Sequence, residues 1–177
     1  MTKPIKALCI LLLLFSGSFA VYASKSPELK SAVELAKSGK QSEAIAAIKK
    51  LIDRDPGPAS LEAHLSLGII YFKSRQYDSS LGEFDLAVAL SKDTPMAYYF
   101  RGLIYEKKAK NSGVTARQAA EFKKAALAQW QAFLETAARV PPVSETRSHN
   151  GITRAQSIER ARQHIKVLTE ELEHEKN

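Results

Sequence analysis

Cysteine is almost absent from this chain of 177 residues, which contains only Cys9. Cys9 lies inside an apolar segment that we expect to be removed, and it precedes most of that segment, so it is not placed as a lipoprotein cysteine. The remaining chain would contain no cysteine. That excludes a thiol nucleophile, a redox-active pair and a cysteine-based metal site. Disulfides are excluded as well, so an exported protein of this sequence would depend on packing for its stability.

Recognisable catalytic and cofactor motifs are also lacking. The sequence has no HExxH zinc motif, no P-loop, no nucleophile elbow and no glycine-rich phosphate turn. The histidines are spread along the chain without a ligand pattern, and His64 falls where a packed side chain is expected. We therefore predict a protein that is not an enzyme and that holds no metal ion and no cofactor.

Neither sign of charge dominates strongly. The chain has 26 basic and 19 acidic residues, a net charge of +7, which falls to +5 when Lys3 and Lys6 are removed with the N-terminal segment. A moderate positive balance favours solubility and contact with acidic surfaces. It does not predict a specific nucleic-acid partner.

The N-terminal segment has the pattern of an export signal. Two lysines precede an apolar run at residues 7–15, and Val21-Tyr22-Ala23 supplies a small-x-Ala site. The run is about half of the ~20 residues that a membrane-spanning helix requires. We predict a signal peptide at residues 1–23, no membrane span after its cleavage, and a bacterial periplasm as the destination. Cleavage after Ala20, secretion, and retention as an N-terminal anchor are the alternatives.

Sustained strand-like alternation is missing too, and the chain after residue 25 has the pattern of successive helices with short breaks. Ser26-Pro27 combines a capping side chain with a proline at the first helical position, and Thr94-Pro95 has the same pattern. Thr115 and Thr153 each begin a capping box. The predicted helices lie at about residues 27–37, 42–54, 61–74, 77–91, 95–108, 115–138 and 153–174.

One sequence phrase is repeated. Leu67-Gly68-Ile69-Ile70-Tyr71 recurs 34 residues later as Arg101-Gly102-Leu103-Ile104-Tyr105. A period of 34 is that of a helical-repeat solenoid. With Gly68 and Tyr71 in a first helix, and Ser80, Phe84 and Ala87 in a second, the chain resembles the tetratricopeptide repeat (TPR) family. The resemblance implies an all-α fold, a short helix-turn-helix solenoid that forms a right-handed superhelix.

The resemblance extends over residues 24–141, with repeats at about 25–58, 61–94 and 95–141. The last repeat has Arg101 in place of the usual leucine. Its second helix matches only with Ala126, Trp130 and Phe133 at the family's positions, which requires about twelve inserted residues near 107–122. Trp130 is then expected in the core.

A loop at residues 142–152 and a C-terminal helix at 153–177 follow the repeats. That helix carries an apolar stripe of Ile158, Ala161, Ile165, Leu168 and Leu172. We expect the stripe to cover the exposed end of the solenoid. The three consecutive aromatics Tyr98, Tyr99 and Phe100 cannot all point inward from one helix.

In the TPR family the first helices of successive repeats line a concave groove, so the resemblance implies binding of another protein or peptide there. The matching positions here are largely apolar: Leu29, Val33, Leu65, Ile69, Phe72, Tyr99, Leu103 and Glu106. A lysine ends each first helix, at Lys37, Lys73 and Lys107. The helix dipole alone favours cations there, and the functional interpretation is a basic ladder that attracts carboxylates. The asparagine and lysine pattern of carboxylate-clamp TPR domains is absent.

These features predict an exported scaffold, or an assembly or chaperone-like factor of the cell envelope, that binds a partner segment in the groove. Two alternatives stay open, together with the oligomeric state. The first is a polyanion-binding module built on the cations of the insertion at residues 107–124, namely Lys107, Lys108, Lys110, Arg117, Lys123 and Lys124. The second is self-association through the C-terminal stripe.

Overall fold

The fold is all-α throughout the part of the chain that the computed structural model describes, residues 26–140 and 153–175. The predicted signal peptide and the whole of the predicted 142–152 loop lie outside these residues. The helices are α1 (Pro27–Lys37), α2 (Gln41–Arg54), α3 (Leu61–Lys73), α4 (Tyr77–Leu90), α5 (Pro95–Ala109), α6 (Ala116–Arg139) and α7 (Arg154–His174), with a short 3-10 helix, η1 (Pro58–Ser60), before α3. None of them is both long and apolar enough to cross a bilayer.

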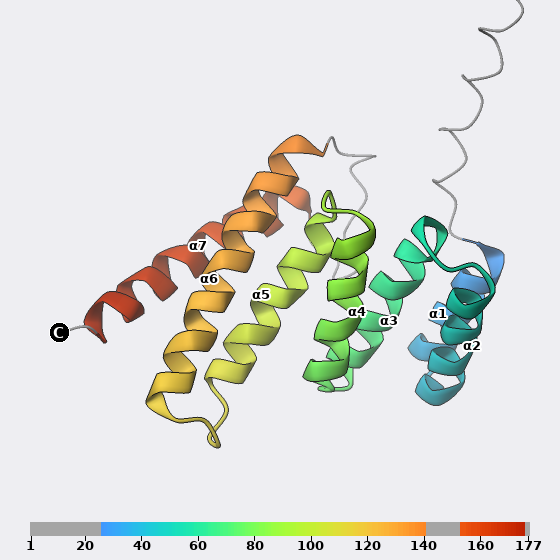
Figure 1. Ribbon diagram of the computed structural model, residues 1–177, viewed down its shortest axis with the longest axis horizontal. Coiled ribbons are helices and arrows are strands. Elements are labelled where there is room, and N and C mark those ends of the chain that lie inside the picture. Colours follow the sequence, from blue (N-terminus) through green and yellow to red (C-terminus); the bar gives the residue numbers. More distant parts are fainter. Residues whose placement is uncertain (1–25, 141–152, 176–177) are drawn as a thin grey trace, which may run out of the picture.

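Consecutive helices pack in pairs, α1 with α2, α3 with α4 and α5 with α6, and the pairs stack side by side in chain order (Figure 1). This is a TPR-like solenoid. Helix α7 lies against α6 at the end of the stack opposite to α1 and α2.

Short-range signals account for several helix ends. The Ser26 hydroxyl accepts the Leu29 backbone N–H at 3.0 Å, and both predicted capping boxes, at Thr115 and Thr153, are formed. After α1, Gly39 adopts φ +86°, a conformation that glycine tolerates without strain. After α2, Gly57 has φ +93° and Pro58 begins η1.

Thr94 occupies the N-cap position of α5, as predicted, but the predicted side-chain cap is wrong. Its side chain makes no capping bond to α5. Instead, the hydroxyl donates a hydrogen bond of 2.6 Å to the carbonyl of Ser91 in the preceding turn, and Thr94 is buried there. Helix α5 still begins at Pro95, because proline at the first helical position supplies the required φ and needs no partner for an N–H.

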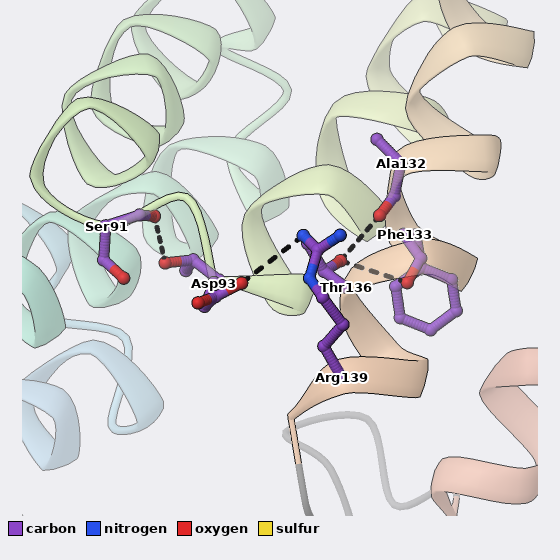
Figure 2. Close-up of polar contacts among 7 residues, drawn as sticks. Ser91, Asp93, Ala132, Phe133, Thr136 and Arg139 are labelled. Atoms are coloured by element: carbon purple, nitrogen blue, oxygen red, sulfur yellow. Dashed lines mark hydrogen bonds and ion pairs between the residues drawn. The ribbon is translucent and has the colours of Figure 1, made fainter.

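The turn between α4 and α5 lies against the C-terminal end of α6. Figure 2 shows the Asp93 carboxylate facing the Arg139 guanidinium, with 3.4 Å between the paired atoms. Nearby, the Thr136 hydroxyl donates to the Ala132 carbonyl at 2.6 Å and so closes back on its own helix. The ion pair is well exposed and adds little stability. It marks where the second and third helix pairs meet.

A glycine on the first helix faces an aromatic ring on the second in two of the pairs. A Cβ atom added to Gly68 would lie 2.8 Å from the Phe84 ring, and one added to Gly102 would lie 2.7 Å from the Trp130 ring. Phe84 and Trp130 are both fully buried. Trp130 of α6 therefore stands where Phe84 stands in α4, which agrees with the alignment predicted across the insertion.

The inserted residues lengthen the third helix pair. Helix α5 has 15 residues and α6 has 24, against 13 in α3 and 14 in α4. In Figure 1 the two helices project as a hairpin beyond the end of the α3–α4 pair. The insertion thus extends existing helices and does not form a separate element.

Helix α7 covers the end of the stack, as its stripe predicts. Ala161 and Leu168 are buried in the same cluster as Trp130, and Ile158 and Ile165 pack against that cluster. Four of the five stripe residues are therefore packed within one chain, which weighs against use of the stripe for self-association.

Candidate partner-binding groove

The predicted groove residues divide into buried and accessible positions. Leu29, Ile69 and Tyr99 are only 4%, 4% and 7% exposed, so they form the floor of the face that α1, α3 and α5 share. The partly exposed positions, which a partner could touch, are Val33, Leu65, Phe72 and Leu103, and the exposed lysines are Lys37, Lys73 and Lys107. That this face binds a partner stays a prediction.

A shallow hollow of about 80 Å³ lies between α1 and α3, and we name it the α1–α3 hollow. The structure brings four of the predicted residues together there, two apolar and two basic. No carboxylate lines the hollow, although the Lys37 ammonium lies 2.6 Å from the Glu34 carboxylate at its edge. Its lining is Val33, Ala36, Lys37, Gln41, Ser66, Ile69, Ile70 and Lys73.

The aromatic side chains of the predicted groove, Phe72 and Tyr99, pack against aromatic rings of the core. The Phe72 ring meets the Phe100 ring edge-on, with 5.2 Å between the centroids. The Tyr99 ring meets the Trp130 and Phe133 rings edge-on at 5.1 and 5.3 Å. Such contacts fix the side chains, so these positions offer a rigid surface and not an adaptable one.

A larger hollow, about 360 Å³, lies between the hairpin of α5 and α6 and helix α7, and we name it the α5–α7 hollow. Sequence reasoning assigned only Glu106 of its lining to the groove. Helix α7 has no counterpart in the repeat pattern, so its polar side chains were not predicted as part of a site. The lining is Glu106, Ala109, Lys110, Lys123, Glu159, Arg160, Gln163, His164, Val167, Leu168 and Glu171.

Glu106 joins three helices at the wall of this hollow. The Trp130 indole N–H donates to its carboxylate at 2.7 Å, and His164 Nδ1 lies 2.7 Å from the same oxygen. The His164 ring also stacks on Trp130, with centroids 4.5 Å apart and planes 11° apart. Burial raises the pKa of the Glu106 carboxyl, but the two hydrogen bonds and the nearby charges of His164 and Lys110 together hold that pKa below its ordinary value.

The free energy of unfolding should therefore depend on pH through Glu106. A carboxyl with a lowered pKa in the folded chain contributes stability above its unfolded pKa, and that contribution is lost as the pH falls through the folded pKa. We expect the wild type to be more stable than Glu106→Gln at neutral pH, and the difference to shrink as the pH falls below about 4.3. Urea unfolding followed by circular dichroism measures this. Glu121→Gln, at an exposed carboxylate, is the control; a difference for Glu106→Gln that is constant with pH would contradict the assignment.

A second attachment holds the C-terminal half of α7. The Lys123 ammonium of α6 lies 2.8 Å from the Glu171 carboxylate and 2.6 Å from that of Glu175. These two hydrogen bonds raise the pKa of Lys123. The Lys123 ammonium is therefore already paired with carboxylates at the C-terminal end of α7.

Pairing of this kind reduces the charge of the basic insertion. Lys108 lies 2.5 Å from the Asp78 carboxylate and 5.2 Å from the centre of the Phe122 ring, and Lys124 lies 2.9 Å from Glu121. With Lys123, half of the six cations are matched by carboxylates. This arrangement weighs against a polyanion-binding module.

Two polar departures from the apolar repeat pattern also have partners. Arg101, which replaces the usual leucine, reaches Asp85 of α4 at 3.1 Å and lies over the Tyr98 ring. His64 Nδ1 lies 2.8 Å from the Glu83 carboxylate between α3 and α4. As expected, His64 is a packed side chain.

No protein-family model and no curated protein matches the sequence. Among solved structures, the chain is similar to MamA from residue 41 to its end, from Desulfovibrio magneticus RS-1, with 19% identity, a TM-score of 0.44, and coverage of 85% of this chain and 76% of that one. A second MamA crystal structure has 19% identity, a TM-score of 0.42, and coverage of 85% and 82%. Neither similarity indicates a partner or an activity for this chain.

Proposed function

We propose that the protein is a non-catalytic scaffold or assembly factor that binds a segment of another protein along the face formed by its first helices. Stacked helix pairs offer an extended surface for holding a partner. The α1–α3 hollow is the observation that supports this most directly. Apolar Val33 and Ile69 lie there together with Lys37 and Lys73, with no carboxylate in the lining.

The proposal includes export to the bacterial periplasm. Its support is the pattern of residues 1–23, in which basic residues, an apolar run and a small-x-Ala site follow one another. The partner would then be a protein of the cell envelope.

Photo-crosslinking in cells tests both parts of the proposal. We expect a crosslinking amino acid at Val33 to capture a discrete protein of the envelope, and the Lys73→Glu change to reduce that crosslink at least tenfold. A crosslinker at Ala46, exposed on α2 and outside the hollow, is the matched control, and Lys49→Glu on α2 is the matched charge reversal. Thermal unfolding shows whether each variant is folded.

Three outcomes would contradict it. Equal capture at Val33 and Ala46 would argue against the α1–α3 hollow as a binding surface. A Val33 crosslink insensitive to Lys73→Glu would argue against the role of charge. Capture of cytoplasmic proteins only would argue against export while leaving the binding surface in place.

A further inference from the structure

The α5–α7 hollow has the size and position of a second binding compartment. Its volume of about 360 Å³ lies within the range of roughly 300–1,000 Å³ typical of ligand sites. Glu106 in its lining occupies the repeat position of Ala36, which lines the α1–α3 hollow. Equivalent positions on α1 and α5 face the same side of the solenoid, so the two hollows open on one face.

The carboxylates of the α5–α7 hollow already have partners. Glu106 is bound by His164 and Trp130; Glu171 lies 2.8 Å from Lys123; and Glu159 accepts a hydrogen bond of 2.9 Å from Gln163. Lys110 and Arg160, by contrast, form no hydrogen bond or ion pair through their side chains with another described residue. Among the charged groups of this hollow, the two without a hydrogen-bonded or ion-paired partner are therefore cations, and the charge of Lys110 contributes to the lowered pKa of Glu106.

Apolar surface accompanies these cations. Val167 is 49% exposed, although most large apolar side chains of the described residues are covered. Ala109 and the buried Leu168 continue the apolar lining. Val167 and the cations Lys110 and Arg160 thus line the same hollow.

We infer that α7 forms part of the binding surface, and that the α5–α7 hollow accepts an acidic polypeptide segment whose carboxylates flank an apolar side chain. This inference rests on the proposed function, since the same segment would run along one face past exposed Lys107 toward the α1–α3 hollow. Carboxylates are the groups that lysine and arginine bind best. Removal of Val167 from water would add a contribution that a purely polar anion cannot make.

The chain contains its own reporter of this site. Trp130 is its only tryptophan, and the ring stacks on His164 and donates to Glu106 at the wall of the hollow. Titration with a leucine–glutamate amphipathic peptide should change the Trp130 fluorescence in a saturable way. The same peptide with lysine in place of every glutamate should not, and polyglutamate should bind at least tenfold more weakly.

Two variants locate the binding. Both Lys110→Glu with Arg160→Glu and the milder Lys110→Gln with Arg160→Gln should weaken binding of the acidic peptide, the former at least tenfold. Lys49→Glu with Lys50→Glu on α2 changes the net charge as the reversal does, at the other end of the stack, and should leave the affinity unchanged. Circular dichroism confirms that each variant is folded.

Equal binding of the acidic and basic peptides, or an unchanged affinity in both hollow variants, would overturn the inference. Equal binding of polyglutamate would overturn the apolar part and indicate a general polyanion site. If the Val33 crosslink persists in the hollow variants and the peptide titration fails, the proposed function stands and the inference does not. If the Val33 crosslink is absent from the otherwise unchanged protein while the peptide titration succeeds, the proposed function is contradicted.

Discussion

Replacing Trp130 with alanine should lower the free energy of unfolding by about 3–5 kcal/mol. The ring is fully buried, it packs against the backbone of Gly102, and it meets Tyr99 and Phe133 edge-on. Its removal would leave a cavity at the point where α5, α6 and α7 meet. It would also leave the buried side of the Glu106 carboxylate without its indole donor. Urea unfolding followed by circular dichroism measures the change, since the only tryptophan is lost.

Trp130→Phe is the matched variant. Phenylalanine retains most of the apolar contact but cannot donate to Glu106, so we expect a smaller loss, about 1–3 kcal/mol. The difference between the two variants separates cavity formation from the lost hydrogen bond. A loss below about 1 kcal/mol for Trp130→Ala would mean that the cluster can collapse around the site, contrary to the close packing described here.

Gly102→Ala should be destabilising although alanine is the better helix former. The added Cβ would lie 2.7 Å from the middle of the Trp130 ring system, and that ring is held on several sides. Forcing a methyl group into a packed core typically costs about 1–3 kcal/mol. Chemical denaturation measures the effect.

Gly82→Ala is the control, because it is the same substitution at a helix position with free space around the added methyl group. Gly82 lies in α4, is exposed, and has nothing within 4 Å of an added Cβ, so alanine should raise stability by roughly 1 kcal/mol. If Gly102→Ala lowers the free energy of unfolding and Gly82→Ala raises it, glycine is required at position 102 because there is no space for a side chain. Equal gains for both would contradict the packing between Gly102 and Trp130.

The repeat alignment put Gly68 and Gly102, and likewise Phe84 and Trp130, at equivalent positions, and in the structure each glycine faces the ring of its own pair. Because Gly68 and Gly102 are equivalent positions, a close approach of α3 and α4 at Gly68 implies a similar approach of α5 and α6 at Gly102. The aromatic ring at each approach is then the residue at the equivalent position of the second helix. The twelve-residue insertion did not disturb this relation, since it lengthened α5 and α6 at the hairpin and left the crossing at Trp130 in place.

Other features depend on information that a repeat does not contain. The Thr94 hydroxyl could either accept a backbone N–H of α5 or donate to the preceding turn. The turn geometry, not the residue type, directs it to the Ser91 carbonyl. The depth of Leu29 and Tyr99 beneath the predicted groove depends on neighbours from other helices. Arg160 and His164 could not be assigned at all, because α7 belongs to no repeat.

The α5–α7 hollow has walls from three helices, so it exists only while α7 is attached. A ligand of the hollow would then bind the attached state and not a state in which α7 has opened locally, and mass action would favour attachment as the ligand concentration rises. Affinity and the local stability of the C-terminal helix become linked quantities. Substitutions that loosen α7 without touching the hollow, such as a change at its Thr153 cap, would weaken binding through the population of competent molecules.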